Sequence, residues 1–204
     1  MKVSFVIPCY RSEHTIGKVV DKIQSTIREN DECEIVLVND CSPDDTFGAI
    51  RRICEKWDNV KGISLAKNFG QHAALMAGFR HVTGDVVVCL DDDGQTPPEE
   101  VYKLLDAMDE KTDVVYAEYE QKKHSFFRNI GSRINAKMTE YLIGKPKNLF
   151  VSSYFAARRF IVDEIVKYEN PYPYVIGLIL RATKNIKNAK VNHHEREEGQ
   201  SGYS

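Results

Sequence analysis

Short apolar runs rich in β-branched residues alternate along the chain with longer amphipathic stretches. Five runs have the length and composition of strands, namely residues 3–7, 34–38, 60–65, 85–90 and 113–117. Several are apolar at every position, which is typical of strands covered on both faces of a parallel sheet. The pattern therefore predicts a mostly parallel sheet whose strands are separated by helices.

The stretches between the runs carry apolar residues at the three- and four-residue spacing of a helix. Three such stripes consist of Ile16, Val19, Val20, Ile23 and Ile27; of Phe47, Ile50, Ile53 and Cys54; and of Val101, Leu104, Leu105 and Met108. Alternation of strand and helix over roughly 120 residues predicts an α/β, Rossmann-like doubly wound sheet with helices on both faces and right-handed crossovers.

Composition narrows the class of protein. The 204 residues are 42% hydrophobic and 28% charged, with a formal net charge of -2, which suits one soluble domain and argues against a nucleic-acid-binding protein. Because no apolar run reaches about 18 residues, we expect no membrane-spanning segment in these residues. The five scattered cysteines indicate reduced thiols in a cytosolic domain.

Polar clusters follow three of the predicted strands, at residues 10–13, 39–40 and 91–93. The carboxyl ends of parallel strands share one edge of the sheet, where ligands bind. Asp91 and Asp93 suit a hard divalent cation such as Mg²⁺, which takes one or two protein carboxylates and completes its shell with phosphate and water oxygens. The alternative is an acidic surface turn, since Asp and Asn also cap helices, and Glu99 and Glu100 suit the first turn of the next helix.

The chain resembles the inverting glycosyltransferases of family 2, which have the GT-A fold, in four consecutive blocks: VSFVIPCYRSEHTI, EIVLVNDCSPDDT, SLAKNFGQHAALMAGF and GDVVVCLDDDGQTPPEE. Asn-Phe-Gly at 68–70 and Gln-x-Pro-Pro-Glu at 95–99 are similar to the polyprenyl-phosphate branch, with its dolichyl-phosphate mannose synthases and undecaprenyl-phosphate sugar transferases. The stretch HHEREEGQSGYS resembles the aminoarabinose transferases of that branch.

The resemblance implies a binding site for a nucleotide-sugar donor, with UDP the favoured nucleotide. Its residues would be Pro8, Tyr10 and Glu13 at the base and ribose, Asp40 at the base, Lys67 and Asn68 beside the nucleotide, and Asp91, Asp93 and Gln95 at the diphosphate and its Mg²⁺ or Mn²⁺ ion. In this scheme Asp93 is the catalytic metal ligand. Simpler structural roles are open for several positions: packing for Tyr10, the core for Phe69 and Leu75, and an unusual backbone turn for Gly70.

The resemblance also bears on the acceptor. Many family members carry a base aspartate where this chain has Ser152 and Ser153, and serine cannot act as a base at neutral pH. A phosphate monoester, with a second pKa of about 6, is already anionic and needs no base. The serines therefore favour a polyprenyl phosphate acceptor over a hydroxyl, and loss of activity is the other explanation.

Residues 121–147 form an amphipathic, basic segment that is typical of a membrane-surface helix, although a helix packed on the sheet with a solvated basic face would show the same pattern. By resemblance, Arg128 and Ser132 hold the lipid phosphate, Arg196 is an anion clamp, and Arg128 and Arg196 join Asp93 in the catalytic set. His193 and His194 are a poor joint metal chelate, because neighbouring residues on a strand face opposite ways.

We therefore expect residues 1–204 to form a single GT-A domain, soluble by itself, that acts at the cytoplasmic face of the plasma membrane. A C-terminal membrane region is expected beyond this chain, and self-association into a homo-oligomer is left open. Two alternatives remain: a family 2 transferase that acts on a saccharide hydroxyl in polysaccharide or lipopolysaccharide assembly, and a non-catalytic nucleotide-sugar-binding module. A phosphatase of the haloacid dehalogenase type is disfavoured, because its Asp-x-Asp follows the first strand, which here ends in Pro8-Cys9-Tyr10.

Overall fold

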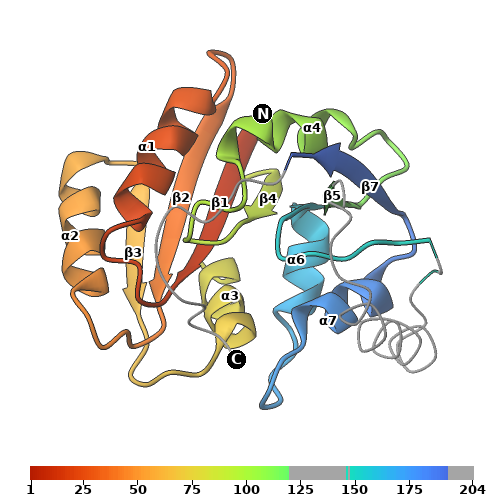
Figure 1. Ribbon diagram of the computed structural model, residues 1–204. Helices are drawn as coiled ribbons and strands as arrows, with labels where there is room; N and C mark the ends of the chain where they lie inside the picture. Colours follow the sequence, from red (N-terminus) through yellow and green to blue (C-terminus); the bar gives the residue numbers. More distant parts are fainter. Residues whose placement is uncertain (120–145, 147, 193–204) are drawn as a thin grey trace, which may run out of the picture.

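The computed structural model describes residues 1–119, 146 and 148–192, and they form a seven-stranded sheet between two layers of helices (Figure 1). The strands lie in the order β3, β2, β1, β4, β6, β5, β7. Their bounds are β1 Lys2–Cys9, β2 Glu32–Asn39, β3 Val60–Ser64, β4 Val86–Cys89, β5 Val114–Tyr119, β6 Phe155–Arg158 and β7 Ile186–Val191.

The sheet is mostly parallel, as predicted. The pairs β1–β2, β2–β3, β1–β4 and β5–β7 are parallel, and among the described strands β6 alone runs against its neighbours, β4 and β5. All five predicted strands are present as β1 to β5, with ends that differ from the predicted ones by a few residues. The fold-class prediction of an α/β sheet with helices on both faces is confirmed.

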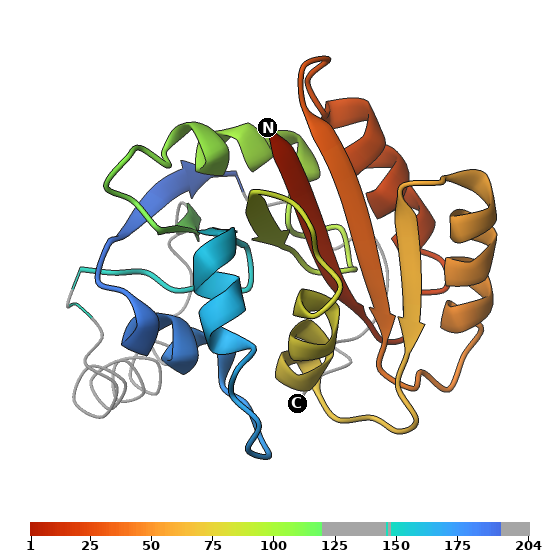
Figure 2. The ribbon, with the colours of Figure 1, turned by 180° about the vertical axis from the view of Figure 1, so that it is seen from behind.

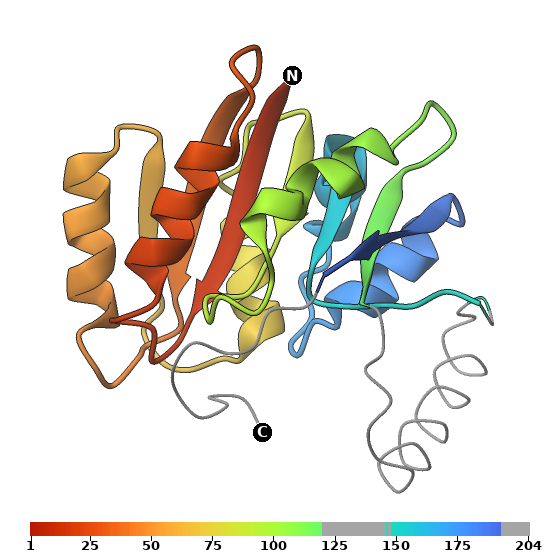
Figure 3. The same cartoon turned by 45° about the horizontal axis from the view of Figure 1, so that its top comes forward.

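Helices cover both faces of the sheet, because alternate residues of each strand face opposite ways. The helical elements are α1 Ile16–Thr26, α2 Thr46–Lys56, α3 Gln71–Phe79, the 3-10 helix η1 Pro98–Glu100, α4 Val101–Asp106, α6 Arg159–Ile165 and α7 Val175–Ala182. Phe5 and Ile7 belong to the core cluster on the face of α1, α2 and α4, whereas Val6 belongs to the cluster on the face of α3, α6 and α7. Figure 2 shows the layer of α3, α6 and α7, and Figure 3 shows α1 and α4 on the other side.

Two of the predicted helical stripes need correction. The buried face of α2 is formed by Thr46, Ala49, Ile50 and Ile53, so Phe47, which is 37% exposed, lies one position off that face. Helix α4 ends at Asp106, so Met108 follows the helix and packs partly buried against the core. In both cases the three- and four-residue spacing of a helix can be placed on the sequence in more than one way, so the sequence alone does not determine which residues face the core.

The turn before α3 is attached to a buried carboxylate at the end of β2. Asp40 has no exposed surface, and its two oxygens accept hydrogen bonds of 2.8 Å from the backbone amides of Phe69 and Gly70. Gly70 has a φ of 87°, a left-handed conformation that favours glycine, as the sequence predicted.

This attachment turns the side chain of Phe69 outward. Phe69 is 53% exposed, so its assignment to the core was wrong, and the ammonium of Lys67 lies 4.8 Å from the centre of its ring. Leu75, on the helix that follows, is 4% exposed and belongs to the core as predicted.

The carboxyl ends of β1, β2 and β4 lie at one edge of the sheet. Cys9 pairs with Asn39, and Val6 pairs with Cys89, so the loops that begin at Tyr10, Asp40 and Leu90 leave the sheet side by side (Figure 1). Searched over the described residues, the structure has no helix that is both long enough and apolar enough to cross a membrane.

Near the amino ends of the strands, Glu34 of β2 links β1, β3 and the residues before β4, and it is 5% exposed. Its carboxylate accepts hydrogen bonds from the hydroxyls of Ser4 and Thr83 at 2.6 and 2.9 Å, and from the ammonium of Lys61 at 3.1 Å. Burial opposes ionisation, but these hydrogen bonds outweigh it and lower the pKa of Glu34 to about 2.

We predict that Glu34→Gln flattens the acid limb of the stability curve. Because the folded-state pKa of Glu34 is lowered, its contribution is complete above the unfolded pKa of about 4.3 and is lost as the pH falls towards 2. Between pH 6 and pH 2 the free energy of unfolding of the variant should change by about 3 kcal/mol less than that of the wild type. Urea denaturation over this range measures the difference. Glu32→Gln, at an exposed position of the same strand, is the control, and equal slopes for wild type and Glu34→Gln would contradict the prediction.

A second prediction concerns the turn before α3. In Asp40→Asn, the side-chain amide group can accept only one of the two backbone hydrogen bonds, and its NH₂ faces the other N–H. Losing a hydrogen bond to a charged acceptor costs about 1.5–3 kcal/mol, so the free energy of unfolding should fall by about that amount. Chemical denaturation measures it, with Asp58→Asn at an exposed position as the control. A loss no greater than that of the control would show that Asp40 does not hold the turn.

Candidate active site

The acidic loop that follows β4 is a tight turn with internal hydrogen bonds. The amide of Asp91 donates to the hydroxyl of Thr96 at 3.1 Å, and the amide of Gln95 donates to the carboxylate of Asp93 at 3.0 Å. Gly94 adopts a φ of 76° between them. The loop leads directly into η1, whose first residue is Pro98, which suits a first helical turn.

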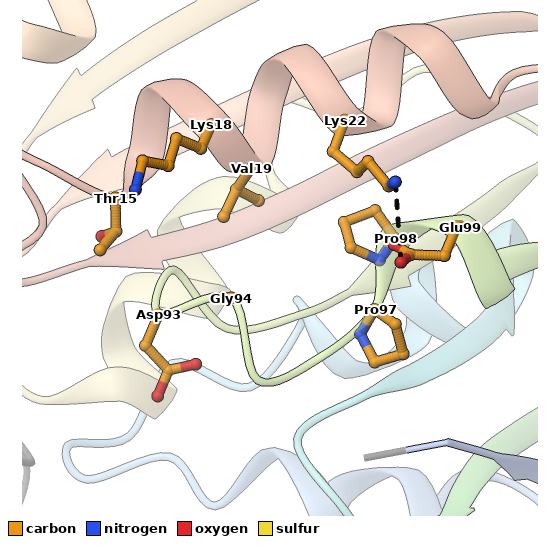
Figure 4. A pocket seen from close by; sticks show the side chains of 9 residues that line it. All are labelled: Thr15, Lys18, Val19, Lys22, Asp93, Gly94, Pro97, Pro98 and Glu99. Carbon is orange, nitrogen blue, oxygen red and sulfur yellow. Dashed lines mark ion pairs between the residues drawn. The ribbon is translucent and has the colours of Figure 1, made fainter. Parts of the chain in front are cut away.

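The three consecutive aspartates of this loop have different partners. Asp91 accepts a hydrogen bond on each oxygen, from the amide group of Gln71 at 2.9 Å and from the hydroxyl of Ser153 at 2.5 Å. Asp92 accepts a hydrogen bond of 2.9 Å from the backbone amide of Tyr10. Asp93 accepts the hydrogen bond from the Gln95 amide, and it is one of the residues around a pocket beside α1 (Figure 4).

Burial and the neighbouring carboxylates raise the pKa values of two residues beside the loop. Burial, together with the charges of Asp91 and Asp93, raises the pKa of Asp92 to about 6. Burial and the same two carboxylates also raise the pKa of Tyr119, at the end of β5. The negative potential of Asp91 and Asp93 therefore extends from the acidic loop across to β5.

The pocket beside Asp93 has a volume of about 320 Å³ and lies between α1 and the acidic loop. Figure 4 shows Lys18 and Lys22 on α1 across the pocket from Pro97 and Pro98 on the loop, with an ion pair of 3.7 Å between Lys22 and Glu99. The carboxylate of Asp93, at the other end of the loop, points away from α1.

The residues predicted to bind the nucleotide surround the same edge, but their accessibility differs. Pro8 is a buried residue of β1, and Tyr10 is partly buried beside it. Glu13 accepts a hydrogen bond of 2.8 Å from the backbone amide of Asp45, and so links the loop after β1 to the start of α2.

Asp40, Lys67 and Asn68 belong to the turn before α3. Asp40 is fully buried and both of its oxygens are used by backbone amides, so in this structure it shapes the turn and presents no surface to a ligand. Lys67 and Asn68 are exposed on the same turn, where the side-chain oxygen of Asn68 accepts a hydrogen bond of 3.1 Å from the amide of Gly70.

The acidic loop suits a hard cation that arrives with further ligands. Within residues 1–119, 146 and 148–192 no group of three or more His, Cys, Asp or Glu side chains is arranged to hold a metal ion. The loop carries Asp91, Asp93 and Gln95 at alternate positions, all with oxygen ligands of the kind that Mg²⁺ and Mn²⁺ accept. This set fits an ion whose remaining positions are filled by phosphate and water oxygens.

Some predicted residues lie outside the described part of the chain. They are Arg128, Ser132 and Arg196, the basic segment 121–147 and the pair His193 and His194. Conversely, the sequence analysis did not identify Gln71, whose amide group binds Asp91. The signal that could have found it is its position at the first residue of a helix that follows the 68–70 turn.

The sequence of the chain matches a known protein family and named relatives. The family model described as "Glycosyl transferase family 2" matches residues 4–166. Two relatives named undecaprenyl-phosphate 4-deoxy-4-formamido-L-arabinose transferase, from Sodalis glossinidius and Klebsiella pneumoniae, are 33% and 32% identical over the whole chain. The chain spans 63% of the length of each of these relatives.

Among solved structures, the chain is similar to the glucosyl-3-phosphoglycerate synthase of Mycobacterium tuberculosis, a GT-A glycosyltransferase. The complex of that synthase with Mn²⁺, UDP and glucosyl-3-phosphoglycerate gives a TM-score of 0.73 at 21% identity, covering 97% of this chain and 73% of that one. Its complex with phosphoglyceric acid gives 0.72 at the same identity and coverage. These likenesses confirm the predicted GT-A fold, and the family model, which matches most of the chain, shows that this chain belongs to glycosyl transferase family 2.

Proposed function

We propose that residues 1–204 are the single GT-A catalytic domain of an inverting, metal-dependent glycosyltransferase. It moves a sugar from a nucleotide diphosphate sugar, with UDP the favoured nucleotide, to a polyprenyl phosphate at the cytoplasmic face of the plasma membrane. The observation that carries the proposal is the acidic loop at the carboxyl edge of the sheet, with Ser153 hydrogen-bonded to Asp91 where a base would otherwise stand.

The similar proteins support the proposed acceptor and the proposed donor. Those that match the whole chain are named undecaprenyl-phosphate 4-deoxy-4-formamido-L-arabinose transferase, which favours a polyprenyl phosphate acceptor. A structure with the same fold holds Mn²⁺ and UDP together, which favours a UDP-sugar donor and a divalent cation, either Mg²⁺ or Mn²⁺.

On this proposal Asp93, with Asp91 and Gln95 beside it, would hold the cation at the donor diphosphate. A divalent cation there neutralises the negative charge that develops on the departing diphosphate. Asp92 has a different role, because its hydrogen bond to the Tyr10 amide fixes the loop after β1 against which the nucleotide would lie. Pro8, Glu13, Lys67 and Asn68 would complete the nucleotide site, and Asp40 would act through the turn it holds.

Inversion follows from the direction of attack. An oxygen of the acceptor phosphate forms a bond to the anomeric carbon as the bond from that carbon to the diphosphate breaks on the opposite face. The electron pair of the broken bond leaves with the nucleotide diphosphate. Because the attacking phosphate oxygen is already anionic, no proton has to be removed, and a serine at position 153 is sufficient.

Arg128, Ser132 and Arg196 are proposed to bind the acceptor phosphate, and residues 121–147 to contact the membrane surface. These assignments follow from the basic, amphipathic character of the segment and from the family resemblance. Arginine suits the role, because its planar guanidinium can donate two hydrogen bonds to one phosphate.

The test is transfer by the purified protein to undecaprenyl phosphate in detergent micelles, with UDP- and GDP-sugars and either Mn²⁺ or Mg²⁺, and with the lipid product identified by mass spectrometry. Transfer to a free saccharide hydroxyl but not to the lipid would contradict the proposed acceptor. Binding of a nucleotide sugar without turnover on any acceptor, in the full-length protein, would favour a binding module.

In the same assay we predict that Asp93→Ala lowers kcat by about 100- to 1,000-fold, the range expected when a group that stabilises developing charge is removed. Because Asp93→Ala also removes the acceptor of the hydrogen bond from the Gln95 amide, the circular dichroism melting curve is recorded alongside, and a melting temperature near that of the wild type excludes loss of folding as the cause. Asp58→Ala, at an exposed position between α2 and β3, is the matched control and should retain full activity. Chelation of divalent cations should abolish transfer by the wild type. Full activity of Asp93→Ala would show that Asp93 is not the metal ligand.

A further inference from the structure

Ser153 occupies a fixed position just before β6, between the acidic loop that follows β4 and the strand β5. It directly precedes Tyr154, whose buried hydroxyl donates a hydrogen bond of 3.0 Å to the carbonyl oxygen of Pro97 at the end of the acidic loop. On its other side, the hydroxyl of Ser152 lies 2.9 Å from the carbonyl oxygen of Ala117 in β5 and 2.8 Å from that of Tyr154. The segment that carries Ser153 is therefore attached both to the acidic loop and to β5.

From this position Ser153 acts on Asp91. Its hydroxyl donates to one carboxylate oxygen of Asp91 at 2.5 Å, and the amide group of Gln71 donates to the other at 2.9 Å. Hydrogen bonds to a carboxylate are short and strong, so the two donors together stabilise the charged form of Asp91 and fix its orientation. The donors come from two segments, the start of α3 and the residues before β6.

The space next to Ser153 is already negative. Asp91 is its direct hydrogen-bond partner, and Tyr119 on β5 has a pKa raised by burial and by Asp91 and Asp93. A second carboxylate placed at position 153 would stand within hydrogen-bonding distance of Asp91. Two like charges this close repel each other strongly where water is partly excluded, and an incoming phosphate would meet the repulsion of both carboxylates.

We propose that Ser153 determines the class of acceptor: its neutral hydroxyl, donating to Asp91, admits an anionic phosphate, whereas an acidic residue there would exclude it. The inference rests on the proposed function and adds to it the residue that makes the selection. Ser153 takes up no proton in the reaction, because the acceptor oxygen is anionic before it attacks the anomeric carbon. Gln71 also positions Asp91, but it is neutral and has no part in the choice between acceptor classes.

The test compares Ser153→Asp with Ser153→Asn, two variants of nearly equal size that differ by one charge. We expect Ser153→Asp to lower kcat/KM for undecaprenyl phosphate by about 100-fold, mainly through KM for the lipid, and Ser153→Asn to lower it by less than about fivefold, because the amide group can still donate to Asp91. Gln71→Ala should instead lower kcat/KM for the lipid and for the donor sugar to the same extent.

Two measurements separate this effect from damage to the fold or to the donor site. The melting temperature reports folding, and calorimetric titration with UDP and Mn²⁺ reports the donor site. Asn170→Asp, which adds the same charge at an exposed position of the loop between α6 and α7, should change kcat/KM by less than about twofold.

If Ser153→Asp does not fold, the charge can be introduced after folding. Ser153→Cys is alkylated with iodoacetate, which adds a carboxylate, or with iodoacetamide, which adds a neutral group of similar size. The background has serine at the three cysteines with exposed surface, Cys33, Cys41 and Cys54. The carboxymethyl protein should lose lipid transfer and the carboxamidomethyl protein should keep it.

Equal losses in the charged and neutral proteins would overturn the proposal, because the effect would then be one of size. Full lipid transfer by Ser153→Asp would overturn it as well. If the wild type transfers sugar to no phosphate acceptor, the proposed function itself fails and this inference fails with it, an outcome that the wild-type reaction alone reveals.

Discussion

The structure around the candidate site depends on how three adjacent carboxylates are kept apart. Asp91, Asp92 and Asp93 follow one another at the end of a buried strand, where their charges repel. The chain separates them by directing Asp91 to Gln71 and Ser153, Asp92 to the Tyr10 amide, and Asp93 to the Gln95 amide of the same loop. Burial raises the pKa of Asp92, and the charges of Asp91 and Asp93 add a smaller contribution from repulsion. On the proposed function, a divalent cation at Asp91 and Asp93 would offset that repulsion and would couple the stability of the loop to binding of the donor.

The contacts of Asp91 with Gln71 and Ser153, and of Asp92 with Tyr10, connect segments that are far apart in the sequence. Asp92 joins the loop after β4 to the loop after β1, and Asp91 joins it to α3 and to the residues before β6. Asp40 adds a fourth connection, from the end of β2 to the turn before α3. Carboxylates at the edge of the sheet thus hold backbone loops in place in addition to any contact with a ligand. A site built in this way is largely preorganised, because its loops are fixed before the substrate arrives.

Much of the first half of the fold could be predicted because its strands are buried on both faces. Residues 3–7 and 34–38 are continuous apolar runs, and such runs have few alternatives to a central strand. The last two strands gave no such signal. β6 is only four residues long and contains two alanines, and β7 lies at the edge of the sheet with the mixed sequence IKNAKV. Edge strands contact the core with only some of their residues, so their sequences are free to be polar.

At the site, residue types could be predicted but partners could not. The sequence pointed to Asp91 and Asp93 because acidic residues that follow a buried strand are conspicuous. It could not show that both oxygens of Asp40 are used by backbone amides, since that contact depends on the turn at Phe69 and Gly70, 29 and 30 residues away. Nor could it show the contact between Ser153 and Asp91, 62 residues apart. The serine is conspicuous in sequence only as the absence of a base, whereas the structure gives its hydroxyl a partner. On the proposed function, a serine in place of a base aspartate removes one negative charge from the site and, as a hydrogen-bond donor to Asp91, keeps its architecture. The charge of the site is what an anionic acceptor would sense.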